Sequence, residues 1–329
     1  MTLTTQETTQ APPPLPVAEF AHRFTAIGDS VAQDIKGKRE VVNTALICLL
    51  AEGHLLVEDV PGVGKTSIAR ALAVALGVNW GRIQFTPDLL PSDVTGVSIF
   101  NQRNQEFQFR PGPVFSSIVL ADEINRASPK TQSALLEVME ERQVTVDGVA
   151  YPVRRPFMVV ATQNPVEMDG TYALPEAQID RFTMRLTVGY PDHTAEMEVL
   201  RTQANGHRAR PVHTVTDATA VGEMIAAAQR VHVGDPVYDY LVRLTAATRT
   251  VPGVRLGASP RAGIALLRVA RAHAAASGRD FVTPHDVKAL AVQVLAHRVL
   301  LTAEAQVGGR SGEDVVRAVL ASTPVPDGR

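Results

Sequence analysis

The sequence predicts an α/β fold, with a core built on a five-stranded parallel sheet covered on both faces, followed by a small all-α domain. Two observations support this prediction. Between about residues 50 and 190, short apolar runs alternate with helical patterns, as is typical of parallel strands buried on both faces. After Pro191 the apolar residues recur at helical spacing, so the second block is predicted to consist of helices.

Five apolar runs are the predicted strands of the core: HLLVE (54–58), RIQFT (82–86), SIVLAD (117–122), FMVVAT (157–162) and MRLTV (184–188). After the first strand, KTSIARALAVALG repeats Ile68, Leu72 and Leu76 every four residues and stops at Gly77, which predicts a helix with a C-terminal glycine. Two hairpins are expected as insertions, at 96–112 and at 143–153. The second contains Asp-Gly between alternating segments, one of the strongest hairpin signals.

The second block is predicted to contain helices within the segments 193–204, 216–231, 235–251, 259–278 and 283–300. The last two open with Ser259-Pro260 and Thr283-Pro284, a capping hydroxyl followed by proline in the first helical position. We therefore divide the chain into a tail (1–17), an α/β core (18–191) and a helical domain (192–329). The tail is rich in Thr, Gln and Pro, which predicts disorder.

The composition is that of a folded globular protein, with 45% hydrophobic and 20% charged residues among 329. The net charge of −2 does not call for nucleic acid or an anionic membrane as a partner. Cys48 lies in the apolar run ALICLL and is expected to be buried packing. No apolar run reaches the length of a membrane span, and the N-terminus has neither a basic start nor an apolar stretch. We therefore expect a cytoplasmic location.

The stretch EDVPGVGKTS (58–67) resembles a phosphate-binding loop, whose usual pattern is G-x-x-x-x-G-K-[ST]. Asp59 stands where the first glycine is expected. That position lies at the end of the strand, so an Asp is tolerated if its carboxylate turns away and caps local backbone groups. Backbone N–H groups of such a loop bind phosphate oxygens, and its Lys and Thr serve the terminal phosphates and Mg²⁺. The residues expected to bind ATP are Pro61, Gly62, Val63, Gly64, Lys65, Thr66 and Ser67.

Asp122 and Glu123 end the third predicted strand. An Asp there can hold Mg²⁺ through water, together with Thr66, and the following Glu can polarise the attacking water. The alternative is a solvated turn. Ser128-Pro129 then predicts a capped helix running to about Arg142.

Three more polar residues are candidates for catalysis. Asn164 ends the fourth strand, where it would orient water, although Asn-Pro also starts ordinary turns. Arg181 precedes the fifth strand and either pairs with Asp180 on the surface or points at a neighbouring subunit's γ-phosphate. Arg261 opens a helix in GASPRAG, where it would reach phosphate or simply lie on the surface.

The series PGVGKT, VLADEINRA, ATQNP, LPEAQIDRF and SPRAG, in this order, resembles the MoxR-type AAA+ ATPases from about residue 20 to 325. The resemblance implies a P-loop AAA+ core, a helical lid and a homo-oligomeric ring, commonly a hexamer. It also implies roles for the candidates: Walker A for Lys65 and Thr66, Walker B for Asp122 and Glu123, sensor 1 for Asn164, the arginine finger for Arg181 and sensor 2 for Arg261. The two hairpins resemble the helix-2 insert and the pre-sensor-1 hairpin of this branch.

The QDIKG stretch (33–37) resembles the adenine-side segment of AAA+ proteins, which makes Ile35 and Gly37 candidates for contact with the nucleotide. A helix ending at Gly37 is the alternative. In MoxR-type systems the client machinery often includes a von Willebrand factor A-domain protein, and the resemblance implies that partner class here.

The expected function is ATP hydrolysis at subunit interfaces, used to remodel or help mature other proteins. Three alternatives stay open: a nucleotide-gated scaffold with weak hydrolysis, a DNA or RNA motor, and a magnesium-chelatase-like ATPase subunit. The hairpins offer few basic residues for a nucleic-acid channel, so nucleic acid is not an expected partner. The histidines show no H-x-x-H or H-E-x-x-H spacing, which leaves the chelatase alternative undecided.

Overall fold

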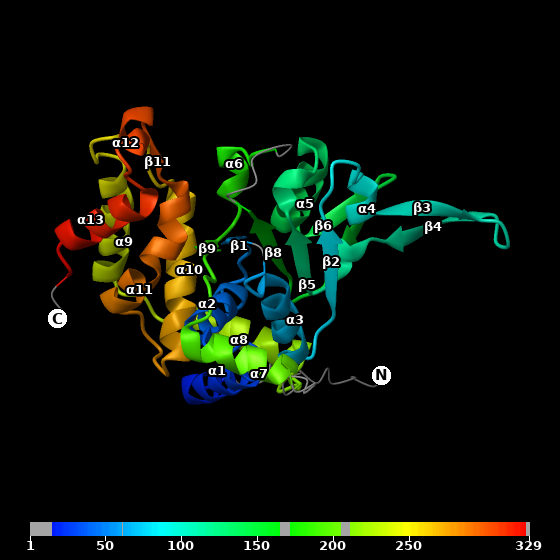
Figure 1. Cartoon of the computed structure of the whole chain (residues 1–329), viewed down its shortest axis with the longest axis horizontal. Coiled ribbons are helices and arrows are strands. Elements are labelled where there is room, and N and C mark those ends of the chain that lie inside the picture. The colour runs from blue at the N-terminus through cyan, green and yellow to red at the C-terminus, as the bar shows by residue number, and fades with distance from the viewer. Residues whose placement is uncertain (1–14, 61, 165–171, 205–210, 327–329) are drawn as a thin grey trace, which may run out of the picture.

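The computed structural model describes residues 15–60, 62–164, 172–204 and 211–326, and it contains the predicted five-stranded sheet (Figure 1). Most of the predicted N-terminal tail and Pro61 lie outside the described residues. Every strand of the sheet is parallel to its neighbours, which confirms the predicted core. The order across the sheet is β2 (Trp80–Gln84), β5 (Ile118–Asp122), β8 (Met158–Gln163), β1 (Leu55–Glu58) and β9 (Met184–Leu186).

Helices cover both faces of this sheet, which explains why its strands are continuously apolar. On β5, Ile118 and Leu120 pack with α1 (Val17–Ala32), α2 (Arg39–Leu50) and α3 (Lys65–Ala75). The alternate residues Val119 and Ala121 pack on the other side with α5 (Pro129–Glu141). The period of two along each strand therefore feeds two separate cores.

Two hairpins leave the core, as predicted: β3 (Gly96–Asn101) with β4 (Glu106–Pro111), and β6 (Gln143–Val146) with β7 (Val149–Pro152). Asp147 and Gly148 both have positive φ, 50° and 78°, as the tight turn favoured by Asp-Gly requires. The ring of Phe109 stacks on Tyr151 with centroids 4.1 Å apart, which joins the bases of the hairpins. In Figure 1 the β3–β4 hairpin extends away from the rest of the molecule.

Short elements connect these parts of the core. Helix α4 (Pro91–Thr95) precedes β3, and single turns form η1 (Pro113–Phe115), η2 (Ile124–Arg126) and α6 (Glu176–Ile179).

All five helices expected after Pro191 are present, as α7 (His193–Ala204), α8 (Ala218–Arg230), α9 (Asp235–Thr248), α10 (Pro260–Ala276) and α11 (Pro284–Leu295). Ser259 caps α10, and Thr283 forms a capping box with Asp286 at the start of α11. The sequence did not predict α12 (Ala303–Val307), α13 (Gly312–Ser322) or the short antiparallel pair of β10 (Val254–Leu256) with β11 (Leu300–Leu301). The end of the last predicted helical segment forms the single turn η3 (Ala296–Arg298).

One hydrophobic cluster runs from the α1–α3 face of the sheet into α8, α10 and α11. Packing therefore joins the two blocks, and the boundary near residue 191 stays a prediction. Among the helices that the structure describes, none combines the length and apolar character needed to cross a membrane. Cys48 is a buried free thiol whose pKa is raised by burial, which confirms the expectation that it is a packing residue.

His54 ties three elements together at the start of β1. Its Nδ1 accepts the Val159 N–H at 3.0 Å, so the proton is on Nε2, which donates to the Met139 carbonyl at 3.1 Å. Burial lowers the pKa of His54 to about 4, because a charged imidazole would be desolvated and would lose its bond from Val159. The neutral ring joins β8, β1 and α5.

We predict that His54 makes the fold sensitive to acid. Between about pH 6.5 and pH 4 the unfolded chain binds the His54 proton and the folded chain does not, so the free energy of unfolding falls as the pH falls. At pH 5 the loss relative to pH 8 is about 2 kcal/mol. Urea unfolding should show this extra loss in the wild type compared with His54→Gln, which keeps a donor and an acceptor but does not titrate. Equal losses in both proteins would contradict the prediction.

Candidate nucleotide site

The loop between β1 and α3 has the backbone of a phosphate cradle. Gly62 and Gly64 have φ values of +85° and +90°, a region in which side chains other than glycine are strained. A Cβ added at either position would meet no atom within 4 Å. The two glycines therefore border open space, into which a ligand can approach the main chain closely.

The N-terminus of α3 is left without a side-chain cap. Among the described residues, this helix has no side-chain cap hydrogen bond, and no acidic residue lies in its first turn. Helices α5, α8 and α10 are capped by Ser128, Asp217 and Ser259, whereas α1, α2 and α9 also lack a side-chain cap; α3 differs from these in the two open glycines that precede it. Free N–H groups at the positive end of a helix dipole bind an anion well. The predicted ligands Val63, Lys65, Thr66 and Ser67 are all half-buried around this turn, so the chain fits a phosphate-bearing nucleotide here.

Asp59 faces away from this cradle. Its Oδ1 accepts the Val60 N–H at 2.8 Å, which is the local capping expected for an Asp at this position. Its Oδ2 accepts the N–H of the distant Gly189 at 2.5 Å. The Asp59 carbonyl meanwhile accepts from Lys65 Nζ at 2.6 Å. Asp59 thus anchors the loop to the chain that follows β9, and it puts no carboxylate beside the phosphate position.

Asp122 and Glu123 lie at the carboxyl end of β5 and share one supporting residue, Thr162 of β8. The Thr162 hydroxyl donates to Asp122 Oδ1 at 2.6 Å and accepts the Glu123 N–H at 2.9 Å. Glu123 has a φ of +56°, which directs the chain away from the strand immediately after Asp122. The sequence analysis missed Thr162, although it lies only two residues before the candidate Asn164.

Three other polar side chains contact these carboxylates and were also missed. Arg82 of β2 pairs with Asp122 at 2.7 Å, and Gln84 donates to Glu123 at 2.9 Å. Arg126 donates to Glu123 at 2.9 Å. The strand RIQFT could have indicated Arg82 and Gln84, because alternate residues of a strand share a face. The register then pairs Gln84 with Asp122 in the structure.

Asn164 follows β8 directly and is buried. Strand β8 lies between β5 and β1, and Gln163 pairs with Glu58 at the end of β1. The parallel sheet therefore brings Asn164, the Asp122–Glu123 pair and the start of the loop to one edge. This shared edge is what the sequence predicts from strand-end positions alone.

The adenine-side candidate Gly37 lies against the chain that follows β9, the same stretch that contains Gly189, the partner of Asp59. Gly37 has a φ of +70°, and a Cβ there would lie 3.0 Å from that of Ala195. Ile35 is buried. Helix α1 ends at Ala32, so the alternative in which a helix ends at Gly37 is wrong. Contact of Ile35 and Gly37 with a nucleotide stays a prediction.

Arg181 and Arg261 converge on one carboxylate, Glu140 of α5. Arg181 Nη2 lies 3.1 Å from Glu140 Oε2, and its Nη1 donates to the Leu136 carbonyl at 2.6 Å. Arg261 Nη1 lies 3.1 Å from Glu140 Oε1. Asp180 pairs with Arg298, so the alternative of an Asp180–Arg181 surface pair is wrong. In the described part of the chain, both guanidinium groups thus bind α5 and not the loop of their own subunit.

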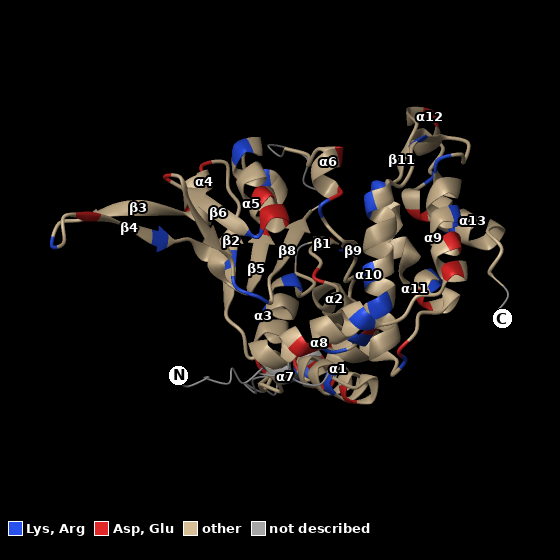
Figure 2. Cartoon of the chain, turned by 180° about the vertical axis from the view of Figure 1, so that it is seen from behind, with Lys and Arg blue, Asp and Glu red and all other residues tan. Residues whose placement is uncertain are grey.

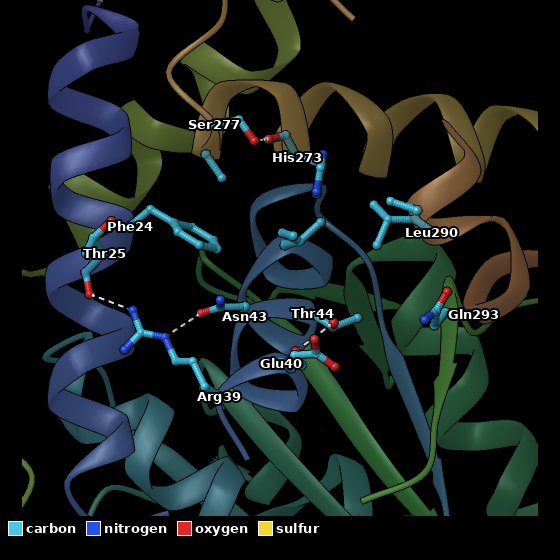
Figure 3. A pocket seen from close by; sticks show the side chains of 13 residues that line it. Phe24, Thr25, Arg39, Glu40, Asn43, Thr44, His273, Ser277, Leu290 and Gln293 are labelled. Carbon is cyan, nitrogen blue, oxygen red and sulfur yellow. Dashed lines mark hydrogen bonds between the residues drawn. The ribbon is translucent and has the colours of Figure 1, made fainter. Parts of the chain in front are cut away.

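A separate pocket of about 470 Å³ opens between α1, α2, α10 and α11 (Figure 3). Arg39 bonds within it to Asn43 and to the Thr25 carbonyl, and the Thr44 hydroxyl bonds to the Glu40 carbonyl. None of the predicted nucleotide ligands is among its lining residues. The pocket is therefore distinct from the candidate nucleotide site.

We predict that Asp59→Gly lowers stability but hardly affects nucleotide affinity. The Val60 and Gly189 N–H groups lose their acceptor, which costs about 1–3 kcal/mol of unfolding free energy. The phosphate-facing residues 62–67 are expected to keep their conformation, because the bonds of the carboxylate go to Val60 and Gly189 and not to these residues. Titration with a fluorescent ATP analogue should show affinity within a few fold of the wild type, whereas Lys65→Ala binds far more weakly. An affinity loss in Asp59→Gly equal to that of Lys65→Ala would refute this loop geometry.

Residues 54–184 match the family model of the ATPase family associated with various cellular activities (AAA), and residues 246–319 match the AAA lid domain. The chain is 51% identical over 293 residues to the uncharacterised protein YeaC of Bacillus subtilis. The matched region covers 88% of this chain and 91% of YeaC. It is 42% identical over 306 residues to the chaperone MoxR1 of Mycobacterium tuberculosis, covering 90% and 80% of the two chains.

A crystal structure of a presumed ATPase from Cytophaga hutchinsonii superposes with a TM-score of 0.88 at 39% identity, covering 94% of this chain and 97% of that one. The agreement extends over the core and the helical domain together. The chain belongs to the MoxR-type AAA+ ATPases.

Proposed function

We propose that this chain hydrolyses ATP bound at the 62–67 loop in the presence of Mg²⁺. The observation that carries the proposal is the uncapped N-terminus of α3 beside two open glycines, at the same sheet edge as Asp122 and Glu123. A phosphate-binding cradle and a pair of carboxylates at one edge are the parts that phosphoryl transfer from ATP requires.

In the proposed reaction, water attacks the γ-phosphorus and the bond to the ADP oxygen breaks. Glu123 polarises the water and accepts its proton, and Asn164 orients it. Lys65 and the loop N–H groups stabilise the charge on the phosphate oxygens. Thr66 and, through water, Asp122 would hold Mg²⁺, which when bound neutralises negative charge on the same oxygens.

We further propose that the site is completed by a neighbouring subunit in a homo-oligomeric ring, of hexameric size by family resemblance. The support is the position of Arg181 and Arg261, which bind Glu140 and not their own loop. A head-to-tail contact delivers such an arginine to the next subunit and closes into a ring when the rotation permits.

The energy of hydrolysis is proposed to remodel or help mature client proteins. One relative of this chain bears the name chaperone MoxR1, which supports a chaperone-like role. A von Willebrand factor A-domain protein is the partner class that the family resemblance suggests. The projecting β3–β4 hairpin (Figure 1) is available for partner contact.

The three alternatives are less well supported. A scaffold with weak hydrolysis has no need for Glu123, Asn164 and Arg181 together. A nucleic-acid motor needs a basic channel, whereas the net charge is −2 and the ribbon in Figure 2 carries Asp and Glu as well as Lys and Arg in both the α/β core and the helical domain. A steep salt dependence of DNA binding would revive that alternative. A magnesium-chelatase-like role would be favoured by neighbouring genes for tetrapyrrole enzymes.

We predict that ATP turnover per subunit rises steeply with protein concentration, because a shared site forms only on assembly. Arg181→Ala should bind ATP like the wild type but stay slow at every concentration, with a loss of about 10³-fold or more. Steady-state phosphate release against concentration, read beside sedimentation velocity, measures both effects. Wild-type turnover that is independent of concentration would count against a shared site.

We also predict that Glu123→Gln separates binding from hydrolysis. The amide keeps the volume of the side chain but cannot take up a proton, so turnover should fall by about 10²-fold or more. ATP affinity, measured with a fluorescent analogue, should stay close to that of the wild type. Glu137 is an exposed residue of α5. Glu137→Gln is therefore a matched control, which should change neither ATP turnover nor ATP affinity.

A further inference from the structure

The backbone around Arg181 is held by the helical domain of the same chain. Arg298 Nε donates to Asp180 Oδ1 at 2.5 Å, and its Nη2 donates to the carbonyls of Asp180 at 3.1 Å and Phe182 at 2.7 Å. Its Nη1 donates to the Thr183 carbonyl at 3.2 Å. One guanidinium group therefore hydrogen-bonds to residues on both sides of Arg181.

Other residues of the helical domain also bind the segment around Arg181. The Ser259 hydroxyl donates to Asp180 Oδ2 at 3.4 Å, and His297 Nε2 donates to the Phe182 carbonyl at 3.1 Å. Arg255 of β10 pairs with Glu176 at the start of α6. The segment from α6 to β9 is thus attached to the helical domain at several points.

The burial and hydrogen bonding of Arg298 indicate that it holds these residues in one fixed geometry. Its side chain is only 4% exposed, and that of Asp180 is 25% exposed. A buried guanidinium is costly unless it is paired and fully hydrogen-bonded, and here its fork satisfies a carboxylate and several carbonyl groups at once. Lysine, with a single ammonium group, cannot reproduce that pattern.

The side chain of Arg181 points the other way, toward α5. It reaches Glu140 and the Leu136 carbonyl, and Glu140 also binds Arg261 from the first turn of α10. The backbone of Arg181 is therefore set by Arg298, while its guanidinium group is paired with a partly exposed carboxylate that it can leave.

We propose that Arg298 is a positioning residue that acts through Arg181. It fastens the Asp180–Thr183 turn to the helical domain, so that the orientation of this domain in one subunit sets where Arg181 lies at the neighbouring subunit's site. The inference rests on the proposed function, in which sites are shared between subunits.

The test uses two variants that are inactive alone but complementary when mixed. Glu123→Gln subunits bind ATP and keep Arg181, so they act as donors of the arginine. Arg181→Ala subunits keep an intact site of their own and act as acceptors. Mixed assemblies should recover ATP turnover at acceptor sites that face a donor.

Arg298→Gln is then placed in one partner at a time. In the donor it should lower the recovered turnover by about tenfold or more, because misplacing a catalytic group by about 1 Å can cost up to 10²-fold. In the acceptor, which has no Arg181, it should change the recovered turnover by less than twofold. A residue with a merely structural role would act equally from either side.

Fluorescent-nucleotide affinity and thermal unfolding of each variant accompany the turnover measurement. Arg298→Lys keeps the charge and serves if Arg298→Gln does not fold; it is expected to cause a smaller loss, again only in the donor. Equal losses from both placements, or no loss from the donor, would overturn the role of Arg298. If the parent variants do not complement at all, the shared site itself fails, and this inference falls with it.

Discussion

Parallel pairing of β5, β8 and β1 is the constraint on which the candidate site depends. It places the ends of three strands at one edge, so that Asp122, Asn164 and the loop after β1 meet without long side chains reaching for one another. Thr162 then locks two neighbouring strands at that edge through the Asp122 carboxylate and the Glu123 amide. Because the strands are buried on both faces, their register resists slipping, and the positions of the polar groups are fixed by the core.

The same sheet connects the site to the helical domain through backbone groups. Asp59, at the start of the loop, accepts the N–H of Gly189, the point at which the chain leaves β9 for that domain. Asp59 therefore has a structural role here: its carboxylate ties the loop after β1 to the segment that leads into the helical domain.

The sequence predicted the parts of the fold that are governed by local periodicity and turn chemistry. The five strands, the Asp147-Gly148 hairpin and the capped starts of α10 and α11 all follow from short-range patterns. The partners of the candidate residues did not follow, because Arg82, Glu140 and Arg298 act across long sequence separations. Motif spacing identifies Arg181, but tertiary packing decides that Arg298 binds the backbone around it. The pair β10–β11 was missed because strands this short carry no periodicity.

Arg181 and Arg298 differ in burial, and this difference decides how firmly each side chain is held. Arg181 and Glu140 are 29% and 37% exposed, and pairs of this kind contribute about 0–1 kcal/mol. An arginine acting on a transferring phosphoryl group contributes roughly 10³–10⁵ in rate, or about 4–7 kcal/mol. The Glu140 pair therefore contributes little compared with the transition-state stabilisation that the proposed role of Arg181 would supply. Arg298, almost fully buried and bonded to several acceptors, cannot leave at comparable cost. The structure thus combines a partly exposed Arg181 guanidinium group with a backbone held by a buried arginine, which is the arrangement that the proposed role of Arg181 at a neighbouring site needs.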